Sequence, residues 1–201
     1  MAVFLHFNSI KDRGWNLIYA ASAEEEVSGK KGIECILKDL GPIDLAIVGE
    51  PTSMEMAIAE KGLLVLDCEY HGVSGHAARD EGENAIYKAL RDLEWFQSYK
   101  FDRESELLGP VKMSVTQIEA GTGHNVVPDI CRFVVDVRCT DVYSLEETLN
   151  IIEEHTDGTI VPRSRRLKPS GISLNHPVVK AAKSLNINCY FDQAVLTMYY
   201  F

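Results

Sequence analysis

Apolar residues recur at every second position in two stretches of the chain. The alternation in LLVLDCEYHG involves Leu64, Leu66, Cys68 and Tyr70, and that between 130 and 138 involves Cys131, Phe133, Val135 and Val137. A period of two predicts strands with one buried face. We predict two further strands at Val111–Glu119 and in GTIVPRSRRL, which ends at Leu167.

Two stretches have the longer period of an amphipathic helix. NAIYKALRDLEWFQSY carries Ile86, Leu90, Leu93 and Phe96 at helical spacing. SLEETLNIIEEH opens with Ser144 and Glu147, which form the pattern of a capping box. Between about Gly62 and Leu167 the predicted order is therefore strand, helix, strand, strand, helix, strand. This is the order of a ferredoxin-like α+β layer.

A different pattern flanks this layer. Asn16–Ser22 and Asp44–Val48 are short apolar runs typical of buried strands, with a helix predicted between them that stops at Gly41. Strand, helix, strand is the pattern of a parallel α/β layer. After the insert, Asn175 as cap and Pro177 near the first helical position predict another helix. The predicted class is α/β, with a domain in 1–61 interrupted by an α+β insert in 62–167 and resumed in 168–201.

Composition narrows the classes of partner. The 201 residues are 46% hydrophobic and 25% charged, with a formal net charge of -10. Such an acidic protein is a poor match for nucleic acid or an anionic membrane surface. No apolar run has the roughly 18–20 residues that span a bilayer. The five cysteines form no CxxC pair, so we expect a cytoplasmic protein with reduced, mostly buried thiols.

Acidic side chains follow both predicted strands of the α/β layer. Glu24, Glu25 and Glu26 come after the first strand, and Glu50 comes after the second. The carboxyl ends of such strands are where sites form. One interpretation is a set of acids that favour the start of the next helix, with Glu50 as a turn residue. The other is part of an oxygen-rich site for Zn²⁺, Mg²⁺ or Mn²⁺.

Three residues of the insert are also candidates. His76 lies in the glycine-rich turn GVSGHAARDEGENA, while Asn125 and Arg138 bracket a predicted strand. Their simplest interpretations are a solvated loop histidine, a turn-forming asparagine and a surface cation. Taken alone, none of them defines a function.

Four motifs together resemble a known family. ASAEEEVSG, VGEPTS, GHAARDEGENA and GTGHNVVPDICRFVVDVR occur in the order and spacing of the dinuclear zinc amidohydrolases and exopeptidases. That family includes acetylornithine deacetylase, succinyl-diaminopimelate desuccinylase, aminoacylases and carboxypeptidase G. The residues of the motifs are most similar to those of acetylornithine deacetylase-like members. The resemblance implies a zinc-exopeptidase-like α/β domain interrupted by a lid and dimerisation domain, in a homodimer. It also implies removal of an acyl group from a small N-acyl amino acid.

The resemblance assigns a role to each candidate residue. It implies two zinc ions per site, with cobalt as an alternative metal, and hydrolysis by metal-activated water. In dimeric relatives the histidine reaches the other subunit's site and steadies the oxyanion. The implied roles are general base for Glu25, metal ligands for Glu26 and Glu50, oxyanion stabilisation for His76, and substrate binding for Asn125 and Arg138.

Part of the family pattern is missing. The sequence has no upstream HxD, no DxKG and no histidine after His176, so Glu26 and Glu50 are the only metal ligands that carry over. We therefore expect this chain to be a fragment of a longer amidohydrolase, with little or no activity alone. Two alternatives remain open, a dipeptidase or aminoacylase of the same family and a dimerisation module without catalysis.

Overall fold

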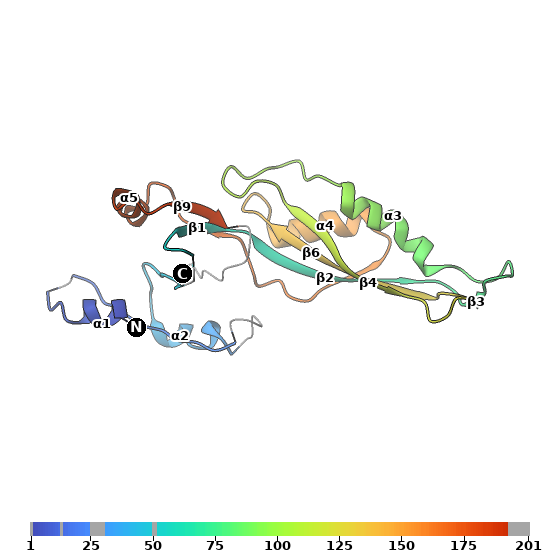
Figure 1. Cartoon of the computed structure of the whole chain (residues 1–201), viewed down its shortest axis with the longest axis horizontal. Helices are drawn as coiled ribbons and strands as arrows, with labels where there is room; N and C mark the ends of the chain where they lie inside the picture. Colours follow the sequence, from blue (N-terminus) through green and yellow to red (C-terminus); the bar gives the residue numbers. More distant parts are fainter. Residues whose placement is uncertain (1, 13, 25–30, 50–51, 193–201) are drawn as a thin grey trace. The chain divides into compact units, whose positions relative to one another are not determined.

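The computed structural model describes residues 2–12, 14–24, 31–49 and 52–192 (Figure 1). The chain divides into two compact units, one within Met1–Ile47 and one within Val48–Tyr199. Helices and sheets both occur, which confirms the predicted mixed α/β class, and all the described strands belong to the second unit.

The first unit departs from the predicted strands. Residues 16–22 and 44–48 form no strand, and Ile18 and Ile47 within them are 54% and 79% exposed. A strand needs a neighbour to take up its backbone hydrogen bonds, and no described strand pairs with either segment. The predicted helix stops at Gly41, whose φ of 70° suits glycine. The helical elements are α1 (Ala2–Asn8), η1 (Ile33–Cys35) and α2 (Leu37–Leu40).

A four-stranded antiparallel sheet with two helices is the main body of the second unit (Figure 1). Its strand order is β4-β6-β2-β7. With strands numbered along the chain as one to four, this is the order 2-3-1-4 of a ferredoxin-like layer, so the predicted layer is confirmed. Its elements are β2 (Gly62–His71), α3 (Ala85–Ser98), β4 (Lys112–Ala120), β6 (Ile130–Cys139), α4 (Leu145–His155) and β7 (Thr159–Pro162).

One face of this sheet forms the core. Leu64 and Val137 are paired across β2 and β6, as are Leu66 and Val135, and all four are fully buried. These side chains point to the same face because successive strand residues alternate between faces. Helices α3 and α4 cover that face with Phe96, Leu149, Ile152 and others. The alternation in the sequence therefore identified the core face correctly.

Both helices begin where the sequence predicts. The side chain of Asn84 accepts the N–H of Ile86 at the start of α3. At the start of α4, Ser144 Oγ accepts the N–H of Glu147 at 3.0 Å, and Glu147 Oε2 accepts the N–H of Ser144 at 2.8 Å. The predicted capping box is thus confirmed.

A second, three-stranded sheet with the order β8-β1-β9 was not predicted. Strand β1 pairs antiparallel with β8 and parallel with β9. Pro177 opens helix α5 as predicted, but the cap is His176, whose Nδ1 accepts the N–H of Val178, and not Asn175. The elements are β1 (Met56–Glu60), β8 (Ser170–Gly171), α5 (Pro177–Ser184) and β9 (Cys189–Asp192).

The cysteines are free thiols. Burial raises the pKa of Cys68 and of Cys139 to about 12, and Cys131 is also buried. Cys189 is half-buried and Cys35 is exposed, so the expectation of mostly buried thiols holds for three of the five positions. Among the described residues, no helix is both long enough and apolar enough to cross a membrane.

Candidate functional site

A small two-stranded sheet brings two of the predicted site residues together. It pairs β3 (Gly75–His76) with β5 (Val126–Val127), and His76 lies directly opposite Val126. The N–H of Ala77 donates to the carbonyl of Asn125 at 3.0 Å. His76 and Asn125 are therefore neighbours, although they come from well-separated stretches of the chain.

The imidazole of His76 is oriented by its own loop. Its Nδ1 accepts the N–H of Ala78 at 3.1 Å. A neutral imidazole that accepts at Nδ1 carries its proton on Nε2, so this hydrogen bond leaves Nε2–H as a donor. The ring is exposed. His76 is thus arranged to donate a hydrogen bond away from its own loop.

Glycines allow the loop around His76 to fold back on itself. Val73 and Glu83 exchange two backbone hydrogen bonds of 2.8 Å. A Cβ at Gly75 would lie 2.5 Å from the carbonyl oxygen of Glu81, and Gly82 has a φ of +90°. Both positions therefore exclude other side chains. The glycine-rich sequence around His76 thus has a structural reason that does not depend on its function.

Arg138 lies on β6, at the end of the four-stranded sheet that is far from His76. Its Nε and Nη2 donate to the two carboxylate oxygens of Asp136 at 2.7 and 3.0 Å. Leu63 lies opposite Arg138, and His71 marks the far end of the same strand, about 26 Å away at the rise of a strand. Within one copy of the chain, Arg138 is therefore well separated from His76 and Asn125.

The predicted metal and base residues cannot be placed in the same way. Glu25, Glu26 and Glu50 lie outside the described residues. Their neighbour Glu24 has a positive φ of 59° and accepts the N–H of Lys31 at 3.1 Å. In the part of the chain that the structure describes, no three His, Cys, Asp or Glu side chains form a group able to hold a metal ion.

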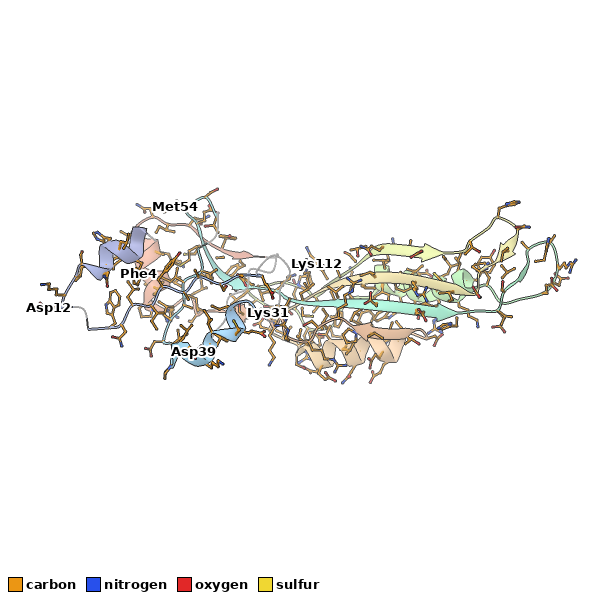
Figure 2. The ribbon with its side chains drawn as sticks, turned by 90° about the horizontal axis from the view of Figure 1, so that it is seen from below. Phe4, Asp12, Lys31, Asp39, Met54 and Lys112 are labelled. Atoms are coloured by element: carbon orange, nitrogen blue, oxygen red, sulfur yellow. The ribbon has the colours of Figure 1, made fainter. Side chains whose placement is uncertain are left out.

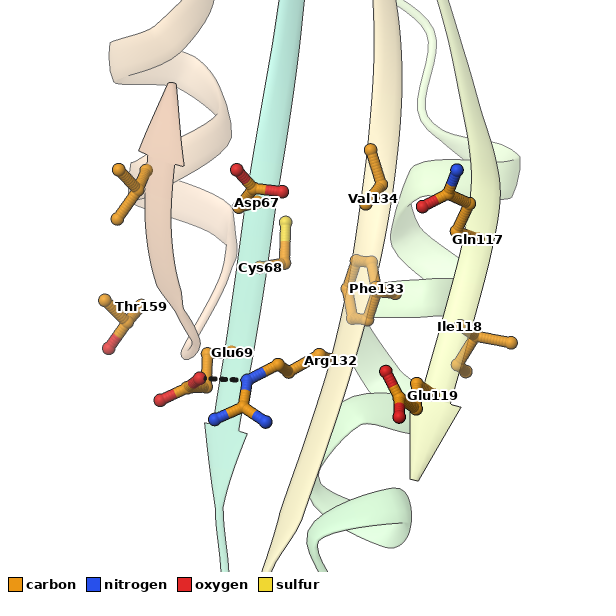
Figure 3. Close-up of a pocket in the computed structure, with 11 residues that line it drawn as sticks. Asp67, Cys68, Glu69, Gln117, Ile118, Glu119, Arg132, Phe133, Val134 and Thr159 are labelled. Carbon is orange, nitrogen blue, oxygen red and sulfur yellow. Dashed lines mark hydrogen bonds and ion pairs between the residues drawn. The ribbon is translucent and has the colours of Figure 1, made fainter. Parts of the chain in front are cut away.

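A broad hollow of about 750 Å³ lies along the four-stranded sheet, away from the predicted site residues (Figure 3). Two of its acidic side chains are paired, since Arg132 donates to Glu69, and Arg163, which is outside the lining, donates to Asp67 at 2.8 Å. These ion pairs lower the pKa of both carboxyl groups. The hollow therefore presents these ion pairs, the carboxylate of Glu119 and apolar side chains such as Ile118 and Val134.

Comparison with protein-family models shows which family the chain belongs to. Residues 58–162 match the family model of the peptidase dimerisation domain, M20_dimer, and this range includes the whole four-stranded sheet with α3 and α4. The match covers more than half of the 201 residues, so the chain belongs to the M20 peptidase dimerisation-domain family. The family predicted from the four sequence motifs is therefore confirmed.

Curated relatives have related names. The succinyl-diaminopimelate desuccinylase of Paracoccus denitrificans is 30% identical over 141 residues, which are 65% of this chain and 37% of that protein. Succinyl-diaminopimelate desuccinylase 2 of a Ruegeria species is 28% identical over 151 residues, or 70% of this chain and 38% of that protein. The chain thus spans less than half the length of these relatives.

Solved structures agree on the fold. A tripeptidase from Staphylococcus aureus matches 87% of this chain and 49% of its own, with a TM-score of 0.62 and 18% identity. An M20 family metallo-carboxypeptidase from Sulfolobus solfataricus matches 72% of this chain and 55% of its own, with a TM-score of 0.53 and 17% identity. At such identities the similarity concerns the fold alone.

Proposed function

We propose that this chain provides the lid and dimerisation part of a metal-dependent amide hydrolase that removes an acyl group from a small N-acyl amino acid. The observation that carries the proposal is the family match over 58–162. The placement of His76 beside Asn125 within that range supports it. We assign 62–167 to the lid, and 1–61 and 168–201 to the catalytic domain.

The family and the relatives' names support the proposed substrate class. The sequence motifs suggest acetylated or succinylated ornithine or citrulline. The curated relatives are named as desuccinylases of diaminopimelate, which adds a succinylated diamino acid. All these compounds carry an amide close to a carboxylate. Arg138 suits that carboxylate because a guanidinium binds it with two parallel hydrogen bonds.

The catalytic roles are proposals of the same kind. Glu26 and Glu50 would hold part of a metal centre, since carboxylates bind Zn²⁺ and Co²⁺ is a plausible replacement. The bound metal would polarise the amide and activate water. Glu25 would take a proton from that water and pass it to the leaving amine. His76 would stabilise the developing oxyanion through Nε2–H, the donor that its Nδ1 contact leaves available.

We further propose that two copies associate through β4 and α3. Strand β4 is an edge of the sheet, and an edge strand offers unpaired backbone groups to another chain. Exposed apolar side chains lie beside it, with Ile118 58% and Val115 36% exposed on β4 and Tyr87 71% and Leu90 52% exposed on α3. We call these four residues the edge patch.

Antiparallel pairing of two β4 strands would complete the site. Lys112 at the start of β4 lies opposite Arg138, and Ala120 at its end lies opposite Cys131, near the β3–β5 sheet. A two-fold axis between the two β4 strands, perpendicular to them, makes the strands run in opposite directions. The end that carries Arg138 in one copy would then lie beside the end that carries His76 and Asn125 in the other. This arrangement explains why a single copy keeps these residues apart.

A substrate panel tests the proposal. A longer protein that contains this chain together with the missing metal-binding segments is incubated with Zn²⁺ or Co²⁺ and with acetylornithine, acetylcitrulline, succinylornithine, succinyl-diaminopimelate and a dipeptide, and amine release is measured. We expect turnover of at least one acylated amino acid. Glu25→Ala should retain metal but lose turnover, and normal turnover in that variant would refute the assigned base. A stable dimer that hydrolyses nothing in the panel would instead favour a dimerisation module without catalysis.

A further inference from the structure

Strand β4 carries one extra residue near its centre. Residues 112–115 lie opposite 135–138 of β6, and residues 117–120 lie opposite 131–134. Thr116 falls at the register shift between Val115 and Gln117 and is the extra residue of a β-bulge. Side chains alternate between the two faces of a strand. The bulge therefore exchanges the faces that even- and odd-numbered residues occupy in the two halves of β4.

The opposite residues of β6 show which face each side chain of β4 occupies. The residues that lie opposite buried residues of β6, and so share the helix-covered face, are Met113, Val115, Ile118 and Ala120. The residues on the open face of the sheet are Lys112, Ser114, Gln117 and Glu119. Open-face positions are thus even-numbered before the bulge and odd-numbered after it.

This exchange of faces restricts the strands that can pair with the free edge of β4. Residues directly opposite each other in an antiparallel pair share a face, and a slip of one residue moves every side chain to the wrong face. A regular strand paired residue by residue with β4 would match the faces of only one half. A second copy of β4 matches both halves when the half before the bulge lies opposite the half after it. Backbone groups alternate with the same period, so matched faces also bring unpaired N–H and C=O groups together.

One register combines matched faces with compatible side chains. Its pairs, each formed between one copy and the partner subunit, are Lys112 with Glu119, Met113 with Ile118, and Ser114 with Gln117. They join opposite charges, two apolar side chains and two hydrogen-bonding side chains, and a two-fold axis repeats each pair. Such pairs directly across antiparallel strands stabilise a sheet. An axis moved by one residue along β4 would set Ser114 opposite Glu119 and leave Lys112 beyond the partner's strand.

The charges along the sheet are consistent with this register. Glu119 lies opposite Arg132, and Arg132 lies opposite Glu69 and donates to it (Figure 3). Lys112 of the partner subunit would continue this alternation of sign. Figure 2 shows Lys112 at the end of the sheet away from β3 and β5, so only an antiparallel copy brings it to Glu119. An ammonium group has three donors, so the pair is compatible with contacts that Lys112 makes within its own chain.

We propose that two copies of this chain pair antiparallel along β4, with Lys112 of each copy opposite Glu119 of the other. The proposal specifies the register of the β4 association in the proposed function and rests on it. Arg138 lies opposite Lys112, so it would be two strand spacings, about 10 Å, from Glu119 of the partner subunit. The register therefore brings Arg138 to the end of β4 from which the partner's chain continues to Asn125.

Cysteine cross-linking of the whole chain tests the register. The background is Cys35→Ser, which removes the exposed thiol. Ser114→Cys with Gln117→Cys should form a covalent dimer on mild oxidation, because opposite Cα atoms are about 4.5–5.5 Å apart and a disulfide spans that distance. Each single variant should remain without a cross-link, since the two copies of one position would be about 10 Å apart along the strands. Ser114→Cys with Glu119→Cys reports the shifted register and should cross-link far less.

A charge exchange tests the same register without cysteines. Glu119→Lys sets like charges opposite each other twice in each dimer, so the dissociation constant of the dimer should rise about tenfold. Lys112→Glu should have a similar effect. The double variant Lys112→Glu, Glu119→Lys should restore the wild-type constant, because opposite charges face each other again. Glu153→Lys makes the same charge change at an exposed site on α4 and should leave the constant unchanged in sedimentation experiments.

The outcomes separate the register from the association itself. A wild-type chain that stays monomeric at the cross-linking concentration would overturn both. A dimer that forms no cross-link through positions 114 and 117, or that cross-links mainly through 114 and 119, would overturn the register alone. A double charge variant as weak as the single variants would have the same meaning. If a charge variant does not fold, as judged by circular dichroism, the cross-linking result decides.

Discussion

The phenol of Tyr70 donates a hydrogen bond of 2.5 Å to Oδ2 of Asp92, and both side chains are buried. The same oxygen accepts the N–H of Asp157 at 2.7 Å. These two contacts join β2, α3 and the segment that leads into β7. They also require that the chain pass very close to the tyrosine ring. At Gly158, a Cβ would lie only 2.3 Å from Cζ of Tyr70.

Replacement of Gly158 by alanine should therefore destabilise the fold. The added methyl group must displace the ring of Tyr70 or strain the backbone, and overpacking of this kind costs about 1–3 kcal/mol. Urea unfolding monitored by circular dichroism measures the loss. Gly123→Ala is the control, since its Cβ would approach no atom closer than 3.6 Å, and its effect should stay within about 0.5 kcal/mol. Equal midpoints for the two variants would contradict this account of Gly158.

The edge patch should control the oligomeric state. Ile118→Asp places a charge in the proposed interface, where it would be buried without a partner, so we expect a shift from dimer to monomer. Val161→Asp is a matched control because Val161 is 53% exposed on β7, at the opposite edge of the sheet. Sedimentation or light scattering distinguishes the two states. A dimeric Ile118→Asp protein, or a monomeric Val161→Asp protein, would argue against the β4 interface.

Subunit complementation tests whether two copies share a site. In the longer protein that carries the metal-binding segments, His76→Ala and Arg138→Ala copies should each be nearly inactive as homodimers. A mixed dimer would contain one site with both residues intact, and half of randomly assembled dimers are mixed. Re-association of equal amounts should thus restore about one quarter of wild-type activity in a two-fold symmetric dimer. If both residues served a site within one copy, no activity would return.

Acid should weaken the start of α4. The N–H of Ser144 and then Arg103 hold the pKa of Glu147 below its ordinary value of 4.5. A carboxyl group with a lowered pKa in the folded state stabilises the fold above the unfolded value, and this contribution is lost as the pH falls through the folded value. Glu147→Gln should therefore be less stable than wild type at pH 7, and the difference should shrink below pH 4.5.

Denaturant titrations at several pH values measure this difference. Glu153→Gln changes an exposed carboxylate on the same helix and serves as the control. We expect its stability relative to wild type to vary much less with pH. A Glu147→Gln deficit that stays constant from pH 7 down to pH 3 would show that the capping charge is not responsible.

The ferredoxin-like layer was predictable because the patterns that define its strands and helices lie within short stretches of sequence. Alternation placed Leu64 and Phe133 on the buried face, and Ser144 with Glu147 marked the start of a helix. By contrast, β1, β8 and β9 pair segments that are far apart in the chain, and two of them are only two and four residues long. Short strands carry too little periodicity to be recognised. The strands predicted at 16–22 and 44–48 were wrong for a different reason. An apolar run resembles a strand, but it forms one only where another strand lies beside it.

The candidate site was predictable only in part. The motifs selected His76, Asn125 and Arg138 as candidates, but their spacing along the sequence does not reveal that the length of β6 separates Arg138 from the other two. Lys61 was not singled out. A lysine within the apolar run AIAEKGLLVL is a weak signal of a buried cation. Its burial and its hydrogen bond to Pro110 emerge only from the structure.

The shortness of β7 has a consequence for how far such a sheet can grow. This strand has four residues, ends at Pro162, and is followed by Arg163 paired with Asp67. Proline and charge discourage further strand pairing at an edge. Of the described strands in this sheet, β4 is then the only long edge open to another chain, and one partner would occupy it completely. Association through this sheet would therefore stop at a closed pair and would not continue into a filament.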